Sequence, residues 1–165
     1  SVGFQVTGGS IDIALVDIGG VKDLAVAAHD LTGTIQTGGA FDLSVTGGYV
    51  DVADAYSWAG LPHSWVVPTT ILALTPSTTS AGGTVSFTVA SVAAAAGTFA
   101  LTTQSSGTDS LLVLSLSNVS MFVGAGATVT NGVASGTVGF QVTGGSIDIA
   151  LVDIGGAKDL RQHEH

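Results

Sequence analysis

The same run of nineteen residues, VGFQVTGGSIDIALVDIGG, occurs twice in this chain, at Val2–Gly20 and again at Val138–Gly156. The copies lie 136 positions apart, and the likeness extends from Ser1–Leu24 to Thr137–Leu160 with only two substitutions. A duplication at a fixed spacing is the sequence signature of a repeat architecture. It therefore predicts a fold in which one segment fills two equivalent positions.

A finer period lies inside the duplication. Similar segments recur every 19 or 20 residues. Each opens on an apolar residue, crosses a corner of small residues such as Gly8-Gly9 or Gly47-Gly48, and then continues with apolar residues. The segments begin at Phe4, Leu24, Leu43, Leu101, Met121 and Phe140. The spacing of 136 then divides into about seven coils of this size. Glycine suits the corners because it tolerates positive φ.

Composition and alternation favour an all-β fold. Of the 165 residues, 24 are Gly, 45% are hydrophobic and only 9% are charged. Alternating apolar residues such as Ile11 and Ile13 would point to one side of a strand, and a single coil cannot bury that side alone. We therefore predict a β-solenoid (parallel β-helix) with coils of about 19–20 residues. The alternative is an immunoglobulin-like β-sandwich, because bacterial immunoglobulin-like domains carry phrases resembling TPSTTSAGGTVSFTV at 75–89.

The expected organisation is a single solenoid domain over 1–160, interrupted by an excursion at 56–76, with a tail at 161–165 (RQHEH) outside the repeat pattern. The excursion holds both tryptophans and all three prolines, and proline cannot donate to a strand ladder. We interpret it as a loop whose aromatics fold back over an apolar edge. The alternative is a ligand loop, since exposed aromatics are favoured binding anchors; its residues would be Tyr56, Trp58, His63 and Trp65.

The sequence indicates no enzyme, no catalytic residues and no cofactor. No nucleophile elbow, phosphate-binding loop or His-Glu-x-x-His motif occurs, and there is no cysteine. The formal charge of −9 disfavours nucleic acid, and no apolar run approaches the roughly 20 residues of a membrane span. The residues that we weigh as calcium ligands are three aspartates, Asp12, Asp51 and Asp148. In alternate coils Asp12 and Asp51 would stand about 10 Å apart, too far to share an ion, which favours solvated strand carboxylates.

The partner that the sequence predicts is the chain itself. A solenoid has open sheet edges, and open edges invite pairing with another chain. The duplicated segment would present a similar edge at both ends, so head-to-tail contacts would build a filament. The expected self-association residues are Phe4, Val6, Ile11 and Ile13 at one end and Phe140, Val142, Ile147 and Ile149 at the other.

The stretch LSNVSMFVGAGATVTNGVASGTVGFQVTGGSIDIALVD, from Leu116 to Asp153, resembles tandem repeats of very large bacterial surface proteins. These are adhesin-like chains related to hemolysin-type and cadherin-like giants. The resemblance implies a non-enzymatic rod or stalk that is extracellular or on the bacterial cell surface. It covers under half of the chain and does not reach the excursion at 56–76.

Overall fold

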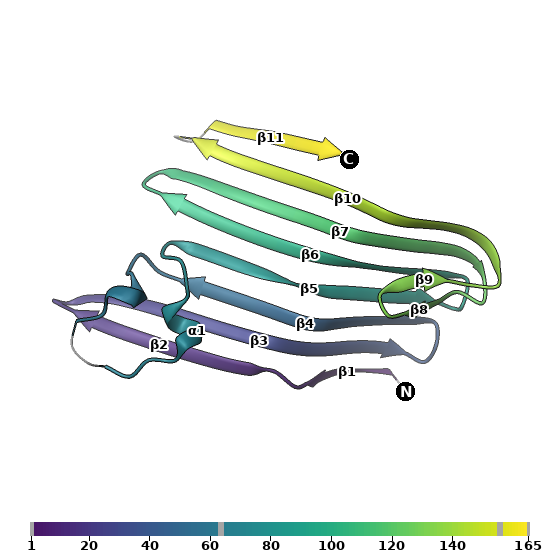
Figure 1. The fold of residues 1–165 in the computed structure, drawn as a ribbon, viewed down its shortest axis with the longest axis horizontal. Helices are drawn as coiled ribbons and strands as arrows, with labels where there is room; N and C mark the ends of the chain where they lie inside the picture. Colours follow the sequence, from purple (N-terminus) through teal and green to yellow (C-terminus); the bar gives the residue numbers. More distant parts are fainter. Residues whose placement is uncertain (1, 63–64, 155–156, 165) are drawn as a thin grey trace.

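The computed structural model describes residues 2–62, 65–154 and 157–164, which are mostly β-strand (Figure 1). The strands are β1 (Val2–Thr7), β2 (Ser10–Ile18), β3 (Val21–Thr37), β4 (Phe41–Ala53), β5 (Thr78–Val89), β6 (Ala93–Ser106), β7 (Asp109–Ala125), β8 (Thr128–Thr130), β9 (Val133–Ser135), β10 (Val138–Ile154) and β11 (Ala157–Glu164). A 3-10 turn, η1 (Trp58–Gly60), and one turn of helix, α1 (Thr69–Leu72), lie between β4 and β5.

Within the described residues, nine strands form one open sheet in the order β1-β3-β4-β5-β6-β7-β10-β11, with β2 also paired to β3. Each of these pairs is antiparallel. Strands β1 and β2 follow one another along the same side of β3, so together they form one border of the sheet (Figure 1). Strand β11 lies at the opposite border.

The structure confirms the all-β class, but the prediction of parallel coils of a β-solenoid is wrong. The strands run as an antiparallel meander, which is closer to the β-sandwich alternative than to a solenoid. The cause is visible between β2 and β3, where Gly19 and Gly20 have φ values of 64° and 86°. Two successive residues with positive φ make the tight turn that joins antiparallel strands. The chain therefore reverses at this point and does not continue around a coil.

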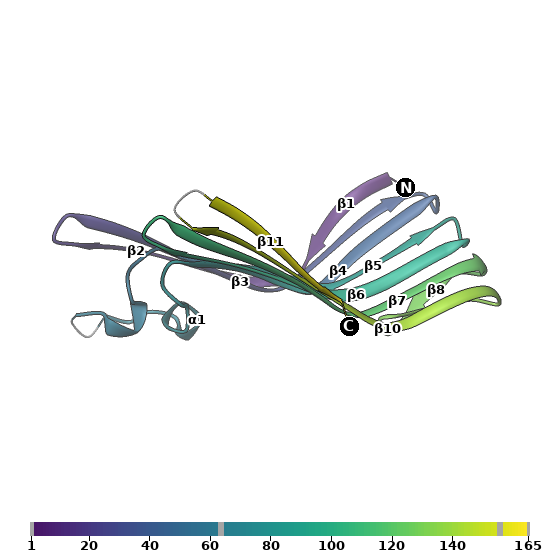
Figure 2. The same ribbon diagram turned by 90° about the horizontal axis from the view of Figure 1, so that it is seen from above.

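The period of 19 to 20 residues is the length of a strand plus its hairpin turn. Strands β3, β7 and β10 each have 17 residues. Several of the predicted corners are β-bulges inside a strand: the register shifts around Gly47, whose φ is 58°. A bulge displaces the alternation by one residue, so Val45 before the shift and Val50 after it face the same way. The strands also change direction near their middle (Figure 2).

Two small layers cover parts of one face of this sheet, the face turned to the viewer in Figure 1. The first is the excursion between β4 and β5, residues 54–77, whose ends are joined where the Ser77 N–H donates to the Asp54 carbonyl at 3.0 Å. Its buried side chains pack on β2 and β3 in a cluster of Val16, Ala25, Ala27, Trp58 and Ile71. The second layer is the β8–β9 hairpin, which packs on β6 and β7 around Ala94, Phe122, Ala127 and Ala134.

Candidate functional site

The strand register divides the sheet into two faces of opposite chemistry. We call one the apolar face and define it by two rows of paired residues that cross seven strand positions: Ile11, Ala28, Val50, Ala81, Leu101, Leu114 and Ile149, and Phe4, Ile35, Leu43, Phe87, Ala95, Met121 and Val142. We call the other the polar face and define it by the adjacent rows, Asp12, Ala27, Asp51, Ser80, Thr102, Val113 and Ala150, and Gln5, Thr34, Ser44, Ser86, Ala96, Ser120 and Thr143. Both covering layers lie on the polar face.

The residues predicted for self-association lie in β1, β2 and β10. Their positions alternate with those of the polar rows, and Ile11 and Ile13, on the apolar face, are 64% and 67% exposed. Val6, Phe140 and Val142 belong to the same face, and the side chain of Phe4 lies outside the described residues. Ile147 and Ile149 do not lie at the border, because β11 pairs with β10 outside them. In this antiparallel sheet, Phe4 and Phe140 stand in strands with five others between them.

The two copies of the duplicated segment occupy equivalent places in the sheet. In the first copy Ile18 pairs with Val21 and Leu15 with Leu24; in the second, Ile154 pairs with Ala157 and Leu151 with Leu160. Thus β10–β11 repeats the register of β2–β3. The sheet carries the same hairpin at both borders, six strand positions apart.

The aromatic residues of the excursion have different environments. Trp58 is 2% exposed and packs edge-on against Tyr56, with ring centroids 6.2 Å apart. Its indole N–H is buried and has no hydrogen-bond partner among the described residues. Trp65 is 51% exposed, and His63 lies outside the described residues. Trp65 is therefore the tryptophan of this loop that a ligand could reach.

The three aspartates weighed as calcium ligands all lie on the polar face. Asp12 accepts a hydrogen bond from the Thr70 hydroxyl at 2.7 Å, and Asp51 lies 2.7 Å from the imidazole Nε2 of His29. Asp148 is exposed and six strand positions from Asp12. In the part of the chain that the structure describes, no group of three or more His, Cys, Asp or Glu side chains could hold a metal ion. The first two carboxylates instead hold neighbouring side chains in place.

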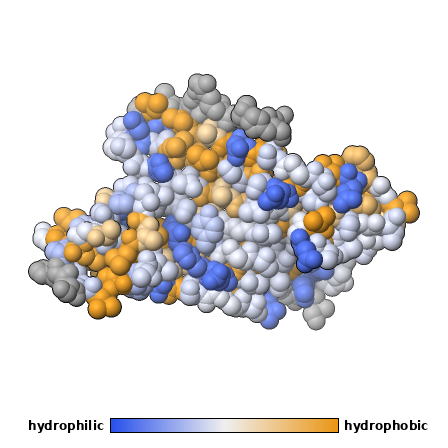
Figure 3. Space-filling view, viewed as in Figure 1, coloured by the Kyte–Doolittle hydropathy of each residue, from blue (hydrophilic) through white to orange (hydrophobic). Residues whose placement is uncertain are grey.

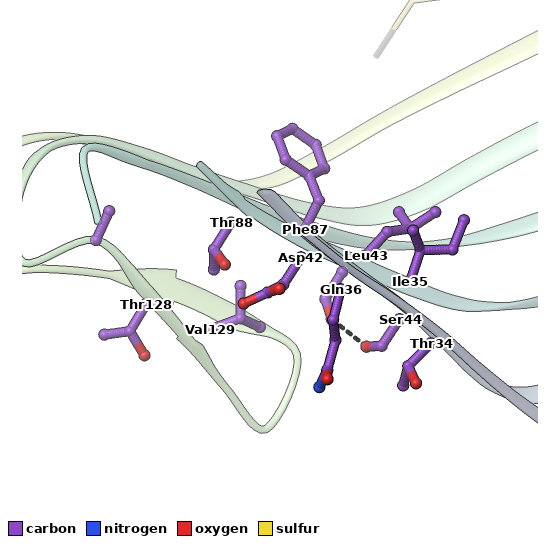
Figure 4. Close-up of a pocket in the computed structure, with 12 residues that line it drawn as sticks. Thr34, Ile35, Gln36, Asp42, Leu43, Ser44, Phe87, Thr88, Thr128 and Val129 are labelled. Carbon is purple, nitrogen blue, oxygen red and sulfur yellow. Dashed lines mark hydrogen bonds between the residues drawn. The ribbon is translucent and has the colours of Figure 1, made fainter. Parts of the chain in front are cut away.

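A shallow pocket of about 340 Å³ opens on the polar face between β3–β5 and the β8–β9 hairpin (Figure 4). Its floor is made of short polar side chains, including Thr34, Asp42 and Ser44, and Ser44 hydrogen-bonds to Ser86 across the strands at 2.7 Å. Figure 3 shows this face as pale and blue over the central strands, with orange side chains over the excursion and also near the upper border, toward the ends of β7 and β10. The pocket offers hydroxyl groups and one carboxylate, without a paired acid and base.

Sequence reasoning missed the apolar face as a continuous surface, because it assumed that alternating apolar residues point into a coil. The signal was present: Leu43, Phe87 and Met121 continue the alternation in strands far from the duplicated ends. Comparison of the chain with models of known protein families, with known proteins and with solved structures found no match. Among the described residues, no helix has the length and hydropathy to cross a bilayer.

Proposed function

We propose that this chain is a non-enzymatic structural repeat of an extracellular or bacterial cell-surface protein, and that its sheet joins end to end with further copies into a filament. The observation that carries the proposal is the same hairpin, in the same register, at both borders of one open sheet. The resemblance of Leu116–Asp153 to repeats of giant surface proteins supports the location.

Strand direction supports growth in one direction. The path from β1/β2 to β11 contains eight strand positions, an even number, so β11 runs opposite to β1 and β2. A second copy placed with its β2 beside β11 would continue the antiparallel pattern without being inverted. Such a head-to-tail contact does not close on itself and extends as a filament. The strands would lie across the filament, and eight positions at about 4.8 Å give an axial repeat of about 38 Å.

The borders favour this pairing. Strand β2 is exposed at Ile13 and Leu15, and no other described strand lies outside it. An unpaired border presents a row of free N–H and C=O groups that bind a further strand. Because each copy carries a formal charge of −9, copies repel one another over distances that salt shortens to about 10 Å at 0.1 M. We therefore expect filaments to form more readily as ionic strength rises, measured by light scattering at fixed protein concentration.

Lysines at the border test the proposal. We expect the double variant Ile13→Lys/Leu15→Lys in β2 to raise the protein concentration needed for filaments by about tenfold or more, because lysine on a border strand blocks strand addition. Negative-stain electron microscopy across a dilution series measures this. The control Thr98→Lys/Thr102→Lys adds the same charge to the central strand β6 and should leave filament formation unchanged. Equal filament formation by both variants, or none by the wild-type chain at high salt, contradicts the proposal.

The alternative function is an adhesin segment that binds a glycan or a protein through the excursion. Trp65 supports this alternative function, because its half-exposed side chain lies beside the fully exposed Val66 and lines a pocket of about 450 Å³. Exposed tryptophans are frequent binding anchors. We expect Trp65→Ala to weaken any ligand found on a glycan array by about tenfold or more, and Val133→Ala, on the other cover, to leave it unchanged.

A further inference from the structure

We propose that the apolar face is a second interface, on which another copy of this chain docks face to face to form a two-layered sandwich of sheets. This contact uses the flat of the sheet and not its borders. It therefore does not depend on end-to-end growth, and either contact can exist without the other.

The two faces differ in chemistry along β3, β4 and β5, as Figure 4 shows. Ile35, Leu43 and Phe87 point to one side of the sheet. Asp42, Ser44 and Thr88 point to the other, toward the β8–β9 hairpin. Cross-strand pairing places these apolar residues in unbroken rows, so the surface they form is continuous.

This apolar surface is open to solvent. Met121 is 46% exposed and Phe140 is 70% exposed, whereas the buried clusters of the molecule lie under the excursion and the β8–β9 hairpin on the polar face. Soluble chains rarely expose continuous apolar patches larger than a few hundred Å² unless the patch is a contact surface. An antiparallel sheet ordinarily buries one face and solvates the other. Here the solvated face has a cover in two places and the apolar face has none among the described residues.

The amount of exposed surface fits one more layer. The chain has an accessible surface of 9800 Å² at a mass of 16.2 kDa. A compact monomer of that mass exposes about 7,500 Å², so the excess is about 2,300 Å². A stable protein–protein contact removes about 800 Å² from each partner, and larger, more apolar contacts are typical of permanent dimers. One face-to-face contact could therefore bury about the excess that this chain carries.

Charge selects a second copy as the occupant. The two rows that define the apolar face contain no ionisable residue, whereas Asp12, Asp42 and Asp51 lie on the polar face. The same face carries Asp17 and Asp153 only near the hairpin ends, where their cross-strand partners are Lys22 and Lys158. Two copies related by a two-fold axis would therefore bring together their uncharged central rows and keep most of the negative charge of each outside. Two sheets packed in this way stand about 10 Å apart with their strands within about 30° of each other.

The test places lysines on opposite faces of the same two strands. Leu101 pairs with Leu114 on the apolar face, and the adjacent Thr102 pairs with Val113 on the polar face. We compare Leu101→Lys/Leu114→Lys with Thr102→Lys/Val113→Lys at low ionic strength, where the charge of −9 on each copy disfavours filaments, so that filaments do not mask the mass. Sedimentation equilibrium should give the native chain and the polar-face pair twice the 16.2 kDa of one chain at about 10 μM. The apolar-face pair should weaken the dimer at least about 100-fold, while far-ultraviolet circular dichroism shows all variants equally folded.

Three results would overturn the inference. The first is a native chain that stays monomeric at about 500 μM under these conditions. The second is an equal loss of dimer in both lysine pairs. The third is a monomer that floats with phosphatidylcholine vesicles and loses this binding in the Leu101→Lys/Leu114→Lys variant. That result would show that the apolar face binds lipid and not a second copy. The Leu101→Lys/Leu114→Lys variant could lose the dimer and still form filaments at high salt. This result would show that the face-to-face contact and the end-to-end contact are independent.

Discussion

Replacement of Trp58 by alanine is expected to lower the free energy of unfolding by about 3–5 kcal/mol. The side chain is 2% exposed and packs in one cluster with Val16, Ala25 and Ile71. Two alanines of β3, Ala25 and Ala27, leave the room that the indole ring fills, so its removal creates a cavity that the stiff sheet below cannot close. Urea unfolding followed by circular dichroism measures the loss.

Two further tryptophan variants make this result specific. Trp65→Ala removes an aromatic that is half exposed and should cost less than about 1 kcal/mol. Trp58→Phe should cost less than Trp58→Ala, because phenylalanine keeps most of the apolar contact and removes an indole N–H that has no partner among the described residues. If Trp65→Ala destabilised the chain as much as Trp58→Ala, the excursion would not be held on the sheet by Trp58.

Several features of this fold can be predicted from the residues alone. Scarce charge, frequent glycine and two-residue alternation indicate strands, and the clustered prolines and tryptophans indicate a segment that leaves the sheet. The segment between β4 and β5, residues 54–77, overlaps the predicted excursion at 56–76. These predictions rest on local chemistry, which does not depend on how distant strands pair.

The direction of the strands could not be read from the period. A coil of a solenoid and a strand with its hairpin turn can have the same length, and a bulge such as the one at Gly47 looks like a coil corner in the sequence. The sharper signal was Gly19-Gly20 between Ile18 and Val21, since two glycines between apolar runs typify a two-residue hairpin. Given that turn, the same repeat predicts a meander.

The different environments of the two copies of the duplicated segment could not be predicted from the sequence either. Val16 is 5% exposed, whereas its copy Val152 is only half-buried. The excursion that covers Val16 leaves the sheet after β4, which lies two strand positions from β2, and folds back over β2 and β3. At Val152 the corresponding cover would come from strands beyond β11. A further copy added with its β2 beside β11 would not supply that cover, because its excursion packs over its own β2 and β3.

Gly3 and Gly139 turn this difference into a test, because they are the same residue of the two copies. A Cβ added at Gly139 would overlap the carbonyl oxygen of Val123 and lie 2.7 Å from the ring of Phe122, whereas a Cβ at Gly3 would have nothing within 4 Å. We expect Gly139→Ala to lower the free energy of unfolding by about 3 kcal/mol, since backbone atoms cannot move aside. For a chain of this size this corresponds to about 10 °C in Tm.

Gly3→Ala is the matched control, with the same chemical change in the same local sequence. It should alter the free energy of unfolding by no more than about 0.5 kcal/mol, because β1 has β3 on one side and no described strand on the other. Thermal unfolding of the two single variants under one condition measures the difference. If the variants had equal Tm values, β10 would not lie against β7 at Gly124 and Phe122. The repeated segment would then have one environment at both borders, and the distinction between the paired copy and the open copy would fail.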